Sequence, residues 1–248
     1  KSKYGNSVEK IQEYAGIKRQ ELDRLNHYEA CKKEQEARLS ALEKQLSGLC
    51  EKLSGLRKKC AKQFEKKLTE HLKDLNFADV RFHIQFEETG HFSEKGTDSI
   101  EFQIAANPGE PVRPLAAVAS GGELSRIMLA IRTLLAEQDH TETLIFDEID
   151  TGISGRTAQK VSEKMALIAA HCQVICITHL PQIAAMADSH FEIRKTVEKG
   201  ATHTGVYRLS EDGACEELAR MLGGAEITDR VLENAVEMRK LARQFKNI

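Results

Sequence analysis

The chain has 248 residues, of which 41% are apolar and 30% charged, and 36 basic against 38 acidic side chains leave a formal net charge of -2. At roughly 150 residues per domain, this length predicts one medium domain with an extension, and the composition excludes collagen-like, low-complexity and wholly disordered chains. No apolar run approaches the roughly 18 residues of a membrane helix and no signal-peptide pattern occurs, so we expect a cytoplasmic protein that does not engage a membrane.

The start of the chain and its cysteines bear on what kind of protein this is. Lys1 enters directly into a charged helical pattern, so we expect a further N-terminal part of the protein to precede it. The six cysteines lie inside periodic helix and strand patterns, which favours a reduced protein over a disulfide framework. Cys172 and Cys176 have no second Cys/His pair at ligand spacing, so we do not expect a metal site there.

Residues 1–75 form the predicted extension. A leucine ladder with spacings of 3 and 4 is typical of a left-handed coiled coil, and its members are Leu39, Leu42, Leu46, Leu49, Leu53 and Leu56. A helix of about 65 to 70 residues would extend on the order of 100 Å. Since an apolar seam is unstable in water, we expect a partner helix, either from another chain or from an antiparallel stretch of the preceding part.

Residues 76–248 form the predicted α/β body. Alternating apolar residues predict an antiparallel hairpin before and after a polar loop at 90–98. Strands at 144–146 and 174–177, separated by a helix at 156–170, predict parallel pairing with both sheet faces covered. A helix precedes them at 124–136, and a closing hairpin and two helices follow, at 190–195 with 205–209, 216–222 and 229–245. The sheet is expected to be mainly parallel, with the antiparallel hairpin added.

Ser120 and Glu123 form a capping-box pattern at the start of a helix, with Gly121 and Gly122 between them. Unpaired N–H groups and the positive helix dipole favour phosphate at such a terminus, and the paired glycines indicate close approach of a ligand. A capped helix without a ligand is the alternative.

Two adjacent carboxylates, Asp147 and Glu148, follow a buried strand, at the edge where α/β sheets bind ligands. One could coordinate Mg²⁺ beside phosphates while the other activates a water molecule. A solvated strand end is the alternative. His179 occupies the equivalent place after the next strand, although a lone histidine can also be structural.

In this order the segments resemble the C-terminal half of an ABC-type ATPase head of the SMC-like group, and most closely the RecN family of bacterial DNA repair proteins. The similar segments are SGGELSRIMLAIR (120–132), LIFDEIDTGISGRTAQ (144–159), THLPQIA (178–184) and ARMLGG (219–224). The resemblance implies a function in DNA double-strand break repair and recombination, with ATP and Mg²⁺ as cofactors. It also implies a homodimer through the heads, sequence-independent DNA binding at the nucleoid, and a recombinase as a further candidate partner.

The resemblance assigns a role to each matching position. Asp147 is implied as the Mg²⁺ ligand, Glu148 as the base for water, and His179 as the γ-phosphate sensor. Asp150 is implied to couple the two sites of the dimer. The signature motif would contact the γ-phosphate of a nucleotide held by the opposite subunit, through Ser120, Gly121 and Gly122. Glu123 stands where transporter ATPases usually have Gln, which favours the SMC-like subgroup.

One expected motif is absent from the sequence. No G-x-x-x-x-G-K-[ST] loop occurs, so most of the binding energy for the β- and γ-phosphates is missing. The resemblance places this Walker A loop in an N-terminal lobe of the same protein, which is therefore an expected partner. We predict that residues 1–248 alone do not turn over ATP.

The base of the arm is the candidate DNA contact. Residues 1–75 carry 18 basic and 12 acidic side chains, whereas the remainder carries 18 and 26. Lys58, Lys62 and Lys66 recur every four residues and share one helical face that could follow a phosphate backbone. An ordinary solvated coiled-coil face is the alternative.

Two other classes of protein compete with the ATPase interpretation. A non-hydrolysing coiled-coil scaffold or chromosome-structural protein could keep the head as a remnant, but intact Asp147, Glu148 and His179 argue against it. A transporter ATPase subunit would lack an arm running straight into the head.

Overall fold

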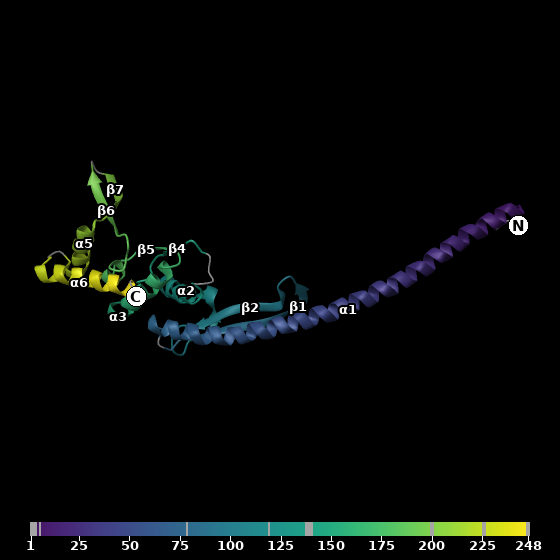
Figure 1. Ribbon diagram of the computed structural model, residues 1–248, viewed down its shortest axis with the longest axis horizontal. Coiled ribbons are helices and arrows are strands. Elements are labelled where there is room, and N and C mark those ends of the chain that lie inside the picture. Colours follow the sequence, from purple (N-terminus) through teal and green to yellow (C-terminus); the bar gives the residue numbers. More distant parts are fainter. Residues whose placement is uncertain are drawn as a thin grey trace. The chain divides into compact units, whose positions relative to one another are not determined.

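The computed structural model describes residues 4, 6–77, 79–118, 120–136, 141–198, 201–224 and 227–246 (Figure 1). It divides into two compact units, residues 1–59 with 88–99 and residues 60–87 with 100–248. No helix in the described ranges is both long and apolar enough to cross a membrane.

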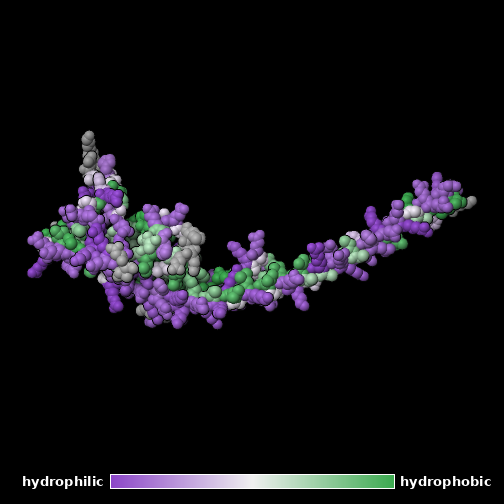
Figure 2. Space-filling model, viewed as in Figure 1, coloured by the Kyte–Doolittle hydropathy of each residue, from purple (hydrophilic) through white to green (hydrophobic). Residues whose placement is uncertain are grey.

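Helix α1 (Val8–Asp74) has 67 residues, as the heptad pattern predicts, and is on the order of 100 Å long. In the first unit the six leucines of the seam are 37–63% exposed, and Figure 2 shows apolar side chains interrupting a mainly hydrophilic surface along this part of the helix. In the second unit the same helix buries Leu68 and Leu72 completely. In the described part of the chain the seam leucines are thus exposed, as the unpaired face of a coiled coil would be, whereas the last turns of the helix belong to a packed core.

A three-stranded antiparallel arrangement follows, with the order β1 (Arg81–Ser93), β2 (Gly96–Ala105) and β3 (Arg113–Pro114). Strand β3 leads into a 3-10 helix at Leu115–Ala117. In the second unit the predicted alternation is confirmed for β1, because Phe82 and Ile84 are buried, whereas Ile100 on β2 is 44% exposed. The rings of Phe64, Phe82 and Phe102 lie 5.5–6.2 Å apart between centroids and join the end of α1 to the hairpin.

The predicted polar loop at 90–98 is wrong. Strand β1 continues to Ser93 and β2 begins at Gly96, so only Glu94 and Lys95 form the turn. Gly96 has φ 88°, which suits a tight turn. Within the first unit, Asp98 accepts hydrogen bonds from Ser54 Oγ at 2.7 Å and Arg57 Nη1 at 3.0 Å. These bonds to α1 stabilise strand pairing where the side chains themselves are too polar to signal a strand.

The body contains the predicted strand, helix and strand. Helix α2 (Gly121–Leu135) precedes β4 (Thr143–Phe146), and α3 (Gly155–Ala169) connects it to β5 (Gln173–Cys176). The two strands pair in parallel, with Thr143 opposite Gln173 and Phe146 opposite Cys176, so the predicted pairing is confirmed. Parallel pairing is limited to these two strands within the described residues, and the other sheets are antiparallel.

The prediction that both faces of this sheet are covered is wrong for the described part of the chain. One face packs into the core through residues such as Leu144 and Phe146. On the other face Ile145, Ile175 and Ile177 are 68%, 44% and 52% exposed. An apolar strand pattern records that a strand is buried in the complete fold, and it does not say which segment provides the cover.

The C-terminal part forms a small second layer around α4 (Pro181–Ala184). The antiparallel hairpin β6 (Phe191–Glu198) and β7 (Ala201–Arg208) projects from it, and α5 (Glu211–Gly223) packs on α6 (Asp229–Lys246) (Figure 1). Their shared core consists of Ala184, Ala185, Leu218, Ala219 and Ala235. The predicted hairpin and both helices are confirmed with longer bounds, whereas α4 was not predicted, because four residues carry no periodic signal.

Candidate functional site

The N-terminus of α2 is capped as the sequence predicts. Ser120 is the N-cap, with extended backbone angles of φ -89° and ψ 121°, and its hydroxyl oxygen accepts a hydrogen bond from the Glu123 N–H at 3.4 Å. The helix then begins at Gly121 with an exposed residue. Its first turn therefore presents backbone N–H groups and the positive end of the dipole at the surface.

The two glycines are required because the loop after β4 lies directly against them. A Cβ atom on Gly121 would lie 2.5 Å from Oε2 of Glu148. A Cβ atom on Gly122 would lie 2.9 Å from the carbonyl oxygen of Glu148 and 3.1 Å from Cβ of Thr151. The signature motif and the acidic doublet, separated by more than 20 residues in the sequence, thus touch in the fold.

The acidic doublet stands at the carboxyl end of β4 with both side chains exposed. The Glu148 N–H donates to Oδ1 of Asp147 at 2.9 Å, and Ser125 Oγ donates to the Asp147 carbonyl at 3.0 Å. Glu148 has φ 56°, in the left-handed region that residues other than glycine seldom adopt. Such strain persists only where surrounding contacts impose it, and here the first turn of α2 and the turn closed by the Thr151 N–H to Glu148 carbonyl bond do so.

Asp150 and His179 are joined in the same unit. Asp150 is 3% exposed, and its Oδ2 accepts from the Thr178 hydroxyl at 2.6 Å and the His179 backbone N–H at 2.8 Å. Nδ1 of the His179 ring lies 3.0 Å from the same oxygen, while the ring itself is 74% exposed. The ends of β4 and β5 are therefore linked through one buried carboxylate.

Arg126 is a site residue that the sequence interpretation missed. Its buried guanidinium donates through Nη1 to the carbonyls of Thr151 at 2.8 Å and Ile149 at 3.3 Å, and it lies over the Phe77 ring at 5.6 Å from the centroid. Burial lowers the pKa of this guanidinium. A charge directly before the apolar run Ile127–Ile131 was the available signal, because a charge on a buried helix requires partners.

The carboxylates also affect a neighbouring thiol. Burial, followed by the negative charges of Asp150 and Asp147, raises the pKa of Cys176 to about 12. The thiol therefore stays protonated at neutral pH and is a poor metal ligand. Within the described ranges no group of three or more His, Cys, Asp or Glu residues could hold a metal ion.

Mg²⁺ nevertheless fits this edge in the manner of nucleotide sites. Mg²⁺ commonly takes one or two protein carboxylates, with phosphates and water completing its octahedron. Asp147 offers an exposed carboxylate at a strand end, beside a helix terminus suited to phosphate. The donor set is compatible with a metal that arrives together with a nucleotide.

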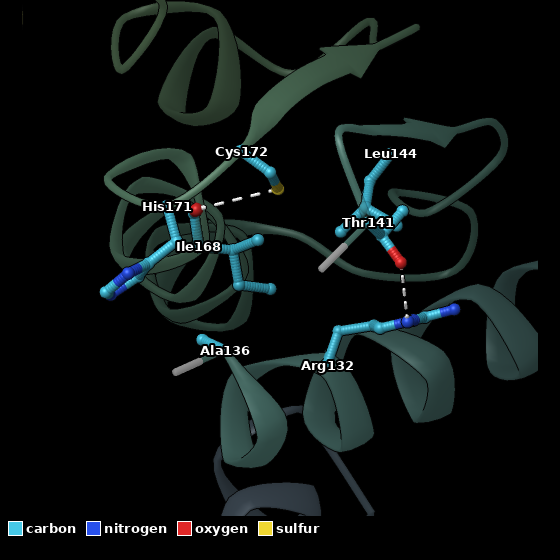
Figure 3. Close-up of a pocket in the computed structure, with 7 residues that line it drawn as sticks. All are labelled: Arg132, Ala136, Thr141, Leu144, Ile168, His171 and Cys172. Atoms are coloured by element: carbon cyan, nitrogen blue, oxygen red, sulfur yellow. Dashed lines mark hydrogen bonds between the residues drawn. The ribbon is translucent and has the colours of Figure 1, made fainter. Parts of the chain in front are cut away.

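A small pocket lies elsewhere, at the amino end of the two strands (Figure 3). Its cavity of ≈ 10 Å³ has room for roughly one water molecule, and Arg132 donates to Thr141 Oγ1 at 3.1 Å in its wall. It includes none of the predicted site residues. A nucleotide therefore does not fit here, and the exposed carboxyl edge remains the candidate site.

The predicted basic stripe lies on helix α1. Lys58 is exposed in the first unit, and Lys62 and Lys66 are exposed in the second. Nearby Arg57 is held by Asp98. The three lysines are therefore accessible to a polyanion, as the predicted DNA contact requires.

The chain is similar in sequence to DNA repair proteins. No family model matches it. It is 42% identical over 250 residues to the DNA repair protein RecN of Halalkalibacterium halodurans, covering 99% of this chain and 44% of that protein. It is 38% identical over 265 residues to the DNA repair protein RecN of Bacillus subtilis, covering 99% of this chain and 45% of that protein. The chain therefore spans less than half the length of these relatives.

Solved SMC heads share the fold. The Smc head domain with a coiled coil and joint from Pyrococcus yayanosii has a TM-score of 0.58 and 20% identity, covering 86% of this chain and 38% of that chain. The Smc head domain with an extended coiled coil from Pyrococcus furiosus has a TM-score of 0.52 and 18% identity, covering 87% and 50%. The predicted fold, part of an SMC-like head that carries a helical arm, is confirmed.

Proposed function

We propose that this chain, a member of the RecN family over its whole length, is the C-terminal part of an SMC-like ATPase that acts in DNA double-strand break repair and recombination. The observation that carries the proposal is the contact between Gly121 and Glu148 at the carboxyl edge of β4. It supports the proposal because a helix terminus suited to phosphate lies beside an exposed acidic doublet, and His179 lies next to Asp150 at the same edge.

In the proposed reaction, a water molecule attacks the γ-phosphorus of ATP, and ADP leaves as the new P–O bond forms. Glu148 accepts the proton of the attacking water, and His179 contacts the γ-phosphate. Asp147 would hold Mg²⁺, which would supply charge neutralisation at the phosphates. The signature motif, Ser120 to Glu123, faces the nucleotide of a second head, so two heads form a homodimer around two nucleotides.

The full protein must supply the Walker A lobe. The exposed face at Ile145, Ile175 and Ile177 supports this part of the proposal, because parallel strands normally have both faces covered by other segments. We assign that face to the N-terminal lobe of the same protein and retain 1–75 as the arm and 76–248 as the C-terminal lobe. The isolated chain then lacks ATPase activity. Mg²⁺-dependent hydrolysis by the purified chain that disappears in Glu148→Gln would contradict this.

The arm is proposed to pair with a second helix, and its base to contact DNA. The exposed leucine seam supports pairing with an antiparallel helix from the preceding part of the same protein. Contacts through Lys58, Lys62 and Lys66 would be electrostatic and independent of sequence. Charge reversal of all three to Glu should flatten the salt dependence of DNA binding, whereas reversal of the exposed Lys10, Lys33 and Lys44 on the same helix should not. An unchanged slope removes the stripe from the proposal.

A full-length Glu148→Gln variant tests the function as a whole. We expect its ATP hydrolysis to fall roughly 10²- to 10⁴-fold, and Mg·ATP to convert the protein into a head-to-head dimer detectable by light scattering. A coiled-coil scaffold with a degenerate head is the second candidate, supported by the long arm alone, and it would show no nucleotide-dependent association. In cells we place the protein in the cytoplasm at the nucleoid, with a recombinase as a candidate partner to be sought by affinity capture.

A further inference from the structure

We propose that Asp150 is a positioning residue that acts through His179, holding its imidazole in one orientation and one tautomer. The inference rests on the proposed ATPase function. It differs from the role implied by the family resemblance, in which Asp150 couples the sites of two subunits. In the proposal made here, Asp150 acts inside its own lobe.

The geometry around one oxygen atom carries the proposal. Oδ2 of Asp150 accepts hydrogen bonds from the Thr178 hydroxyl at 2.6 Å and from the His179 backbone N–H at 2.8 Å. The ring nitrogen Nδ1 of His179 lies 3.0 Å from the same oxygen. Thr178 Oγ1 in turn accepts the Leu180 N–H at 3.0 Å, so the hydroxyl proton is directed at Asp150. The loop after β5 is thereby held by its backbone and by both side chains.

Asp150 and His179 can contact different partners, because Asp150 is buried and the His179 side chain is exposed. Asp150 is 3% exposed, accepts two hydrogen bonds and has the His179 ring nitrogen 3.0 Å away, so it is poorly placed to reach a nucleotide or a second subunit. The His179 ring is 74% exposed and can reach a nucleotide. The carboxylate is therefore the support, and the ring is the group that contacts ligand.

The contact sets which ring nitrogen carries a proton. A carboxylate oxygen and an unprotonated ring nitrogen would repel each other at 3.0 Å, so the approach favours a proton on Nδ1 and leaves Nε2 as the acceptor of the neutral ring. Nε2 can accept from water in the neutral ring, or donate to a phosphate oxygen when it is also protonated. In that second state the negative charge of Asp150 balances the ring, as carboxylates do behind catalytic and metal-bound histidines.

Asp150 also lies in the turn that begins at Glu148, closed by the Thr151 N–H to Glu148 carbonyl bond. Glu148, the proposed base, therefore lies in this turn, and His179, the proposed sensor, contacts the turn through Asp150. A shift of this turn would move both groups together.

The test uses the full-length protein and the variants Asp150→Asn, His179→Ala and their combination, with Asp188→Asn as a control at an exposed aspartate outside the site. We expect Asp150→Asn to lower kcat roughly 10- to 100-fold with little change in KM, and to have no further effect when His179 is already Ala. The control should match the wild type. Near-normal kcat in Asp150→Asn, or losses that multiply in the double variant, would overturn the proposal.

A second measurement does not require an Asp150 variant to fold or the protein to hydrolyse ATP. ¹⁵N NMR of histidine-labelled wild-type protein, with His179→Gln to identify the signals, reports which ring nitrogen is protonated. We expect the Nδ1–H form, and a dominant Nε2–H form rejects the proposal. If this tautomer is found but neither Glu148→Gln nor His179→Ala affects hydrolysis, the proposed function fails while the positioning contact stands.

Discussion

The side chain of Glu148 lies so close to Gly121 that a methyl group on the glycine would be 2.5 Å from Oε2. The proposed catalytic base therefore rests on the first residue of the signature helix. The helix terminus and the acidic side chain form one surface, and any residue larger than glycine at this position must displace the glutamate.

The two glycines should respond differently to alanine. In Gly121→Ala the atom displaced is the end of a flexible side chain, so we expect little loss of stability but a large loss of ATP hydrolysis. In Gly122→Ala the nearest atom is the backbone oxygen of Glu148 at 2.9 Å, so the free energy of unfolding should fall by about 1–3 kcal/mol. Chemical denaturation and ATPase assays of the full-length variants distinguish the two cases. Equal stability losses would show that the contacts are not as described.

Arg126→Lys should be destabilising although it keeps the charge. A lysine cannot direct one planar group at the carbonyls of Ile149 and Thr151 while stacking over Phe77. We expect a loss of about 1–3 kcal/mol in the free energy of unfolding, measured by denaturant titration. Arg230→Lys, at an exposed position, is the matched control. An Arg126→Lys midpoint equal to that of the control would rule out a supporting role.

Stability should depend on pH through the contact between His71 and the buried Lys164, whose Nζ lies 3.0 Å from Nδ1 of the ring. Burial, and then the Lys164 ammonium, lowers the pKa of His71 from its ordinary value of about 6.5. Below that pH the unfolded chain binds the proton more readily than the folded one. The free energy of unfolding therefore falls as pH drops from roughly 7 to 5.

His71→Gln removes this titration while keeping an acceptor for Lys164, so the pH slope should become shallower. It should not vanish, because burial also lowers the pKa of His190. Thermal unfolding of both proteins across this pH range measures the slopes. A variant slope identical to the wild type would exclude His71 as the titrating group.

Ile145→Asp should lower the stability of the full-length protein far more than the exposure of Ile145 in this structure implies. If the N-terminal lobe covers this face, the substitution buries a carboxylate at the interface between lobes, and both stability and ATP hydrolysis should fall. Ile193→Asp is a close control, since Ile193 is another well-exposed strand isoleucine, on β6. Equal, small effects of the two changes would leave the face without an assigned partner.

Local patterns in the sequence predicted much of the fold. The heptad leucines, the Ser120 cap and the alternation in β1 depend on neighbours within a few residues, so composition and spacing reveal them. The polar tip of the hairpin escaped prediction because Asp98 is held there by Ser54 and Arg57, which lie more than 40 residues earlier.

The sequence by itself determined a long helical arm, an α/β body, and the residue types that a phosphate site needs at the ends of its strands. Only the tertiary structure decided that Glu148 rests on Gly121, that Arg126 holds the carbonyls of the loop after β4, and that Asp150 orients His179. It also decided that Ile145, Ile175 and Ile177 are exposed on one face of the strand pair in the described part of the chain. Each of these features depends on segments that packing brings together. The period of a helix or strand predicts which side chains are buried, but it does not predict which segment they pack against.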